Sequence, residues 1–161
     1  MQFDLRPHYA FAYYAKSMEF ESKELLYYSR KENALHYKFK ASRFDIEYRK
    51  LKDMECSVPI PDKEAKALET VFGLMVDAMK AYKGEPWYVC DGCCCTVICG
   101  KRRVHFESPC MEPFEDFYHM ANSLLRIMEK WNQKQFEETM KMVPEVSKKL
   151  IAHTVSARRL R

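Results

Sequence analysis

Residues 24–50 read ELLYYSRKENALHYKFKASRFDIEYRK, and this stretch decides the fold because polar and apolar side chains alternate along much of it. The alternation is clear over residues 35–40, and it returns at Phe44, Ile46 and Tyr48. A period of two residues indicates half-buried antiparallel strands with one face in water. We therefore expect strands over both parts of this stretch.

Short segments with turn chemistry separate the expected strands. Residues 31–33 (KEN) and 41–42 (AS) are the predicted turns, and residues 17–22 (SMEFES) are predicted to add a strand before the main stretch. The prolines of SVPIPD, residues 57–62, end the alternation.

Helical spacing replaces the alternation in the second half of the chain. Apolar residues recur every three or four positions over 62–82 and again over 113–131, which predicts two long helices. Asp62 is the predicted N-cap of the first helix. Pro144 should kink or end any continuation of the second, and residues 145–160 form a third predicted helix.

These elements predict an α+β fold in two layers. We expect an antiparallel sheet of about five to six strands, with two long helices packed on one face and a C-terminal basic helix. We divide the chain into one domain over 1–143 and the basic helix over 144–161. An alternative is a ββα pseudo-repeat over 24–83 and 86–133, because strand, Cys- and Pro-containing loop, and helix recur in outline.

Composition indicates a globular protein of the cytoplasm. The chain has 161 residues, 47% of them hydrophobic and 31% charged, which excludes low-complexity and strongly disordered classes. Its apolar runs are far shorter than the roughly 20 residues that cross a bilayer, so we expect no membrane partner. We see no signal peptide, and an odd count of seven cysteines favours free thiols in a reducing compartment.

Five of those seven cysteines lie in residues 88–107, YVCDGCCCTVICGKRRVHFE. A two-residue turn at Gly100 and Lys101 predicts a hairpin. Its register follows directly: Val97 faces Val104, Cys95 faces Phe106, Thr96 faces His105 and Cys94 faces Glu107. This register sorts Cys93, Cys95 and Cys99 onto an apolar face and leaves Cys94 on the other.

The outward face of this hairpin suggests one catalytic hypothesis. Cys94, His105 and Glu107 would lie near one another, and a cysteine beside a histidine oriented by a carboxylate is the general arrangement of an activated thiolate. The alternative is a set of ordinary cross-strand neighbours. We favour the alternative and expect no enzyme, because nothing marks an oxyanion hole.

Cys90 and Cys93 form a C-x-x-C pair, which is half of a structural zinc site. The other ligands would have to converge from dissimilar spacings. Cys99, Cys110, His105 and His119 are the candidates. The alternative is a bend or bulge at Asp91 and Gly92, and we expect no bound cofactor, with zinc as the alternative.

The whole net charge of +4 resides in residues 144–161, because removing their five bases and one acid leaves 22 of each sign in the rest. This segment is a predicted partner-binding arm for an acidic protein or for nucleic acid phosphates. Its candidate contacts are Lys148, Lys149, Arg158, Arg159 and Arg161. The alternative is a solvated helix end, where cations complement the helix dipole.

No phosphate-binding, dinucleotide-binding, esterase or zinc-protease motif occurs in the chain. Residues 36–40, HYKFK, do not form a base-stacking platform, because their aromatic side chains face opposite to the lysines. We therefore expect a small protein-interaction module, a regulator or a stoichiometric inhibitor, with a protein as its partner. The alternatives are a metal-containing nucleic-acid-binding module using Cys90, Cys93 and the basic arm, and a thiol enzyme centred on Cys94.

Overall fold

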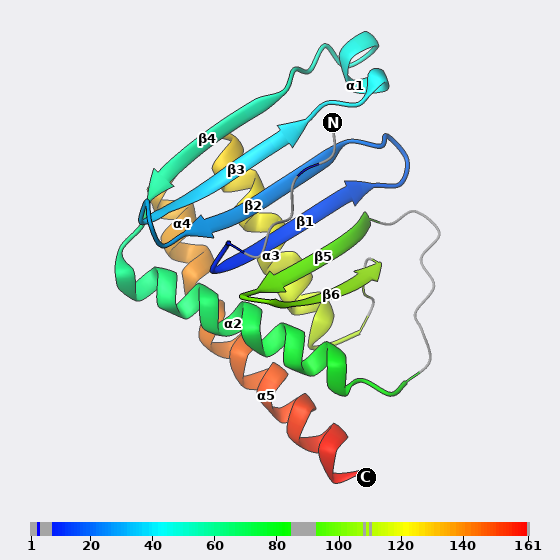
Figure 1. The fold of residues 1–161 in the computed structure, drawn as a ribbon, viewed down its shortest axis with the longest axis vertical. Coiled ribbons are helices and arrows are strands. Elements are labelled where there is room, and N and C mark those ends of the chain that lie inside the picture. Colours follow the sequence, from blue (N-terminus) through cyan, green and yellow to red (C-terminus); the bar gives the residue numbers. More distant parts are fainter. Residues whose placement is uncertain (1–2, 4–7, 85–92, 108, 110, 161) are drawn as a thin grey trace.

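The computed structural model describes residues 3, 8–84, 93–107, 109 and 111–160. Six antiparallel strands form one sheet in the order β4-β3-β2-β1-β5-β6, and two long helices, α2 and α3, lie against one of its faces (Figure 1). The strands are β1 (Phe11–Ser17), β2 (Lys23–Ser29), β3 (Ala34–Lys40), β4 (Met54–Pro59), β5 (Cys93–Cys99) and β6 (Arg102–Glu107). The helices are α1 (Arg43–Glu47), α2 (Asp62–Ala81), α3 (Phe114–Glu129), α4 (Gln133–Met140) and α5 (Val143–Arg159). The predicted α+β class is confirmed.

The main core lies between the sheet and the pair α2 and α3. Phe11 of β1 packs on Phe72 of α2 with ring centroids 4.6 Å apart, and Phe72 meets Phe117 of α3 at 5.1 Å. All three side chains are fully buried. Alternate residues of each strand point to this side and form one wall of the core, and the apolar stripes of α2 and α3 form the other. Phe136 of α4 and Val143, Val146 and Leu150 of α5 belong to the same core.

The opposite face of the sheet, called here the outer face, has no helix on it in the described residues. Its centre is still apolar, because Ala12, Leu25 and Ile98 are buried there beneath the side chains of Phe3 and Tyr9. The central strand β1 is therefore covered on both sides.

The hairpin of β5 and β6 has the predicted register. Cys94 pairs with Glu107, Thr96 with His105 and Val97 with Val104. Gly100 has φ 60°, as a turn glycine requires. The separation of the sulfurs into an inner set and an outward Cys94 follows from this register.

Two predicted strands and one predicted helix cap are wrong. Residues 43–49 are not a strand, because 43–47 form helix α1. Residues 17–22 mainly connect β1 to β2, and β1 lies upstream of them. Asp62 is the first residue of α2 rather than its cap, which is Pro61.

The C-terminal third is helical. α4 ends at Met140, and Pro144 stands in the first turn of α5, where its missing N–H costs nothing. α5 runs along α2 and continues past it at the lower end of Figure 1. None of the described helices has the length and apolar character that a membrane span requires.

Candidate functional site

The predicted metal half-site is only partly described. Cys90 and Cys110 lie outside the described residues, so a site that includes them stays a prediction. Cys93 is half-buried on the helix-facing side of β5, and burial raises the pKa of its thiol. Among the described residues, no three His, Cys, Asp or Glu side chains form a group suited to a metal ion.

The predicted thiol site is brought together only in part. Cys94 and Glu107 are direct cross-strand neighbours, as expected. However, His105 Nδ1 lies 2.7 Å from Thr96 Oγ1, and the Cys94 thiol lies 3.1 Å from the sulfur of Met18. No described hydrogen bond joins Cys94 to His105, so this geometry lacks the thiol–imidazole contact that activation needs.

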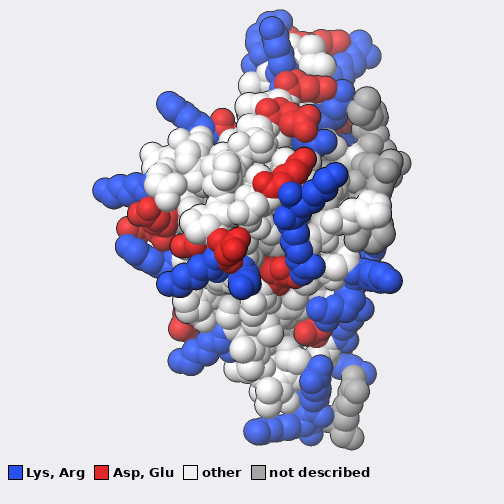
Figure 2. Space-filling view, turned by 60° about the vertical axis from the view of Figure 1, so that its left-hand side comes forward, with Lys and Arg blue, Asp and Glu red and all other residues white. Residues whose placement is uncertain are grey.

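The basic arm divides into a structural part and an exposed part. Lys149 Nζ lies 2.8 Å from Asp116 and 3.4 Å from Glu112, so it ties α5 to α3. Lys148, Arg158 and Arg159 are exposed and have no ion pair within the described chain, while Arg161 lies outside it. Figure 2 shows Lys and Arg side chains at the lower end of the molecule, where α5 ends.

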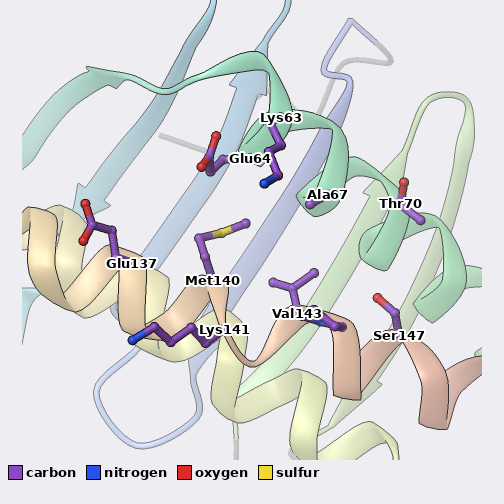
Figure 3. Close-up of a pocket in the computed structure, with 10 residues that line it drawn as sticks. Lys63, Glu64, Ala67, Thr70, Glu137, Met140, Lys141, Val143 and Ser147 are labelled. Carbon is purple, nitrogen blue, oxygen red and sulfur yellow. The ribbon is translucent and has the colours of Figure 1, made fainter.

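A groove of about 460 Å³ lies between α2 and the junction of α4 and α5. Met140 and Val143 point into it opposite Ala67 (Figure 3). Its two hydroxyl groups belong to Thr70, which donates to a backbone carbonyl of its own helix, and to Ser147. No histidine or cysteine lines the groove, so it has no nucleophile–base pair of the usual kind.

A different surface stands out by its exposed apolar side chains. Of the ten large hydrophobic side chains exposed in the described residues, six lie between residues 18 and 54, at the end of the sheet where α1 projects (Figure 1). We call the surface formed by Met18, Phe20, Phe44, Ile46 and Tyr48 the aromatic tip. Ile46 is 55% exposed and Tyr48 72%. Such a concentration of exposed apolar groups marks an interaction site more often than a lone exposed leucine does.

The buried carboxylate of Asp45 holds the backbone of the aromatic tip in place. Asp45 is fully buried and accepts hydrogen bonds from the backbone N–H and the hydroxyl of Ser42, both at 2.9 Å, and from Arg49 at 3.3 Å. Ser42 returns a capping bond, since its hydroxyl accepts from the Asp45 N–H at 3.1 Å. The Asp45 carbonyl also accepts from the Leu51 N–H at 2.9 Å. Because Asp45 points inward, its neighbours in this short helix point out.

Ring stacking joins α1 to the loop between β1 and β2. Phe44 stacks on Phe20 with ring centroids 5.0 Å apart, and it packs at a tilt against Tyr48 with centroids 5.1 Å apart. The guanidinium of Arg49 lies 5.4 Å from the Phe20 ring centroid, within cation–π range. These contacts hold the side chains of the aromatic tip in place within the chain itself.

Strained backbone conformations also occur beside the aromatic tip. Three non-glycine residues of the described chain have positive φ, and two of them flank this surface: Glu21 at 57° and Lys50 at 55°. The third, Asn33, occupies the turn between β2 and β3, where asparagine tolerates this conformation. A non-glycine residue held there costs on the order of 1–3 kcal/mol and is enriched at binding sites.

This surface was not predicted, because the alternation of polar and apolar residues placed Phe44, Ile46 and Tyr48 on the buried face of a strand. A local signal was present in Ser42 and Asp45, whose S-x-x-D spacing is that of a helix-capping box. Fold and surface together define a two-layer α+β protein with an exposed aromatic surface at one end of its sheet. No protein-family model, curated protein or solved structure matches the chain.

Proposed function

We propose that this chain is a protein-interaction module that binds a protein partner through the aromatic tip. It acts by occupying that partner, as a regulator or a stoichiometric inhibitor does, and not by catalysis. The observation that carries the proposal is the exposure of four large hydrophobic side chains in the aromatic tip, those of Met18, Phe44, Ile46 and Tyr48. Leaving them in water forgoes about 25 cal/mol for each Å² of apolar surface that a partner would bury.

The chemistry of the aromatic tip favours a protein over other partners. Aromatic residues, methionine and arginine are the residue types enriched at the centres of protein interfaces. Phe44, Tyr48, Met18 and Arg49 are of these types, and the rings already pack on one another. Exposed rims of mixed charge, as Arg43 and Glu47 provide beside the rings, suit the polar border of such an interface.

Site-specific photo-crosslinking tests the proposal. A photoreactive phenylalanine analogue replaces Tyr48 in one sample and Ile151 in a control, because Ile151 is 48% exposed on α5, far from the aromatic tip. Both proteins are irradiated in extract of the native cell. We expect a protein crosslinked from position 48 and absent from position 151.

The crosslinked protein is then purified and titrated against defined variants. Ile46→Ser with Tyr48→Ser should weaken binding at least tenfold, because the hot-spot side chains of an interface each contribute 2 kcal/mol or more. Ile151→Ser with Val155→Ser is the matched control and should leave the affinity unchanged. Equal loss in both double variants, or no loss in either, contradicts the proposal.

A second candidate is nucleic acid binding by the basic arm. The three exposed cations Lys148, Arg158 and Arg159, which have no ion pair in the described chain, are the observation that favours it. Replacing all three by glutamine should then abolish a steep salt dependence of oligonucleotide binding. An affinity for the oligonucleotide that does not change with salt concentration excludes this candidate.

A further inference from the structure

Three lysines lie side by side across three neighbouring strands. Lys16 of β1 pairs in register with Lys23 of β2, and Lys23 pairs with Lys40 of β3. Directly opposed residues of an antiparallel pair share one face, so all three side chains point to the outer face. We call Lys16, Lys23 and Lys40 the lysine row.

The lysine row is only partly neutralised. Lys40 forms an ion pair with Asp53, which lowers the pKa of that carboxyl group. Lys16 and Lys23 have no ion pair in the part of the chain that the structure describes. Two acidic residues of the adjacent loop, Glu19 and Glu21, are exposed and form no ion pair there either. Like charges directly opposite in a sheet are destabilising, so the fold gains nothing from this arrangement.

The lysine row lies next to the aromatic tip. Lys16 and Lys23 stand at the two ends of the segment that carries Met18 and Phe20, and Lys40 precedes the cap of α1 by two residues. In Figure 1 these strand ends meet at the edge of the sheet from which α1 projects. A partner that covers the aromatic tip and extends onto the outer face therefore reaches the lysine row.

We infer that the lysine row binds carboxylate groups of the protein that docks on the aromatic tip, so that the partner presents an acidic segment beside apolar residues. This inference rests on the proposed function and adds the chemistry of the partner. Lys16 and Lys23 are half-buried ammonium groups in register that form no ion pair with the described residues. Beside an apolar surface, they complement a segment in which Asp or Glu side chains flank aliphatic or aromatic ones.

A nucleic acid fits this face less well. The outer face, on which the lysine row lies, does carry aromatic rings, and these come from β1 and β2 rather than from β3. However, Tyr27 already stacks on Tyr9 at 4.2 Å and on His36 at 4.6 Å, and Tyr14 packs on Phe3 at 6.0 Å. Base stacking needs an accessible ring face, and these rings already pack on one another.

The test uses a displayed library of random 16-residue peptides selected on the intact, immobilised protein. Peptides that lose binding to Ile46→Ser with Tyr48→Ser are kept as ligands of the aromatic tip and sequenced. We expect them to carry an excess of Asp and Glu over Lys and Arg. Synthetic copies of three of them, and of versions with every acid changed to its amide, are then titrated.

Charge removal at the lysine row gives the quantitative readout. Lys16→Gln with Lys23→Gln should weaken binding of the acidic peptides about 5- to 30-fold, because each ion pair at the protein surface contributes modestly and two are lost. Lys31→Gln with Lys101→Gln removes two exposed charges from turns at the opposite end of the sheet and should have no effect. The amide peptides should bind both double variants and the parent protein alike.

The outcomes separate the inference from the proposed function. Tip-dependent peptides without acidic excess, or with affinities indifferent to Lys16 and Lys23, overturn the inference and leave the proposed function standing. If no peptide depends on the aromatic tip and no protein crosslinks from position 48, both the inference and the proposed function are contradicted. A third outcome is that the selection yields no acidic peptides while a 20-nucleotide oligothymidylate binds in a salt-sensitive way that requires Lys16 and Lys23. This outcome assigns the lysine row to phosphates and also overturns the inference.

Discussion

Replacing Asp45 by alanine tests whether one buried carboxylate holds the aromatic tip in place. The change removes the acceptor for the Ser42 N–H and hydroxyl and for Arg49. It also leaves the Ser42 N–H without its capping partner. Asp45→Asn keeps the shape and one carbonyl oxygen while removing the charge, and Glu47→Ala, on the exposed side of the same helix, is the control.

The magnitude follows from the bonds that are lost. A hydrogen bond to a charged group contributes about 1.5–3 kcal/mol, and the long contact to the half-exposed Arg49 adds little. Two good bonds from Ser42, discounted because they share one carboxylate oxygen, give a local loss of about 2–4 kcal/mol. Because α1 has five residues and projects from the sheet, this loss should melt α1 without unfolding the core.

Native-state hydrogen exchange is the assay, with the Leu51 amide as the probe because it donates to the Asp45 carbonyl. We expect its protection to fall about 30- to 900-fold in Asp45→Ala, which is 2–4 kcal/mol at 1.36 kcal/mol per factor of ten, and less in Asp45→Asn. Tyr13 in β1 should keep its protection in both variants. A Leu51 amide that is unprotected in the parent protein, or one that is equally affected by Glu47→Ala, refutes the idea of a rigid aromatic tip.

Three further predictions use other parts of the molecule. Lys23→Glu should raise the free energy of unfolding by about 0.5–1 kcal/mol in urea titrations, because it places opposite charges in the lysine row; a loss of stability would contradict the like-charge argument. Burial lowers the pKa of His153, so the unfolded chain takes up a proton first, and stability should fall as the pH drops below about 6.5 toward the lower folded pKa. His153→Phe should flatten this part of a stability–pH curve, and an unchanged slope would assign it to another group. Burial raises the pKa of Cys95 to about 12, so mass spectrometry after iodoacetamide at pH 8 should find Cys94 modified and Cys95 intact; a Cys94 rate above that of a free thiol would instead revive the thiol enzyme.

Local chemistry explains which parts of the fold were predictable. The register of β5 and β6 depends on a turn at Gly100, and turn chemistry acts over a few residues, so the sequence predicted it correctly. β1 was missed because its residues are covered on both faces, which leaves a nearly continuous apolar run in place of alternation. β4 was missed because of its terminal Pro59, which an edge strand tolerates.

The candidate site was harder to predict because it depends on packing between distant segments. Alternation at Phe44 and Ile46 is the same whether the segment is a strand or a short capped helix, and the buried Asp45 decides between them. Likewise, Lys149 looked available in the basic arm, and only the packing of α5 on α3 pairs it with Asp116. The lysine row emerges only when β1, β2 and β3 are placed in register.

The strand order has a consequence for how the chain is made in the cell. β1 is central in the finished sheet, yet one of its two neighbours, β5, is synthesised much later, since Tyr13 and its contact Cys95 are 82 positions apart. At about 5–20 residues per second, a ribosome takes roughly 4–16 s to supply that neighbour. During this interval β1 has an open hydrogen-bonding edge, first before and then after β2, β3 and β4 complete a four-stranded meander. A chaperone that covers this open edge would keep the N-terminal half from pairing with other chains until β5 is made.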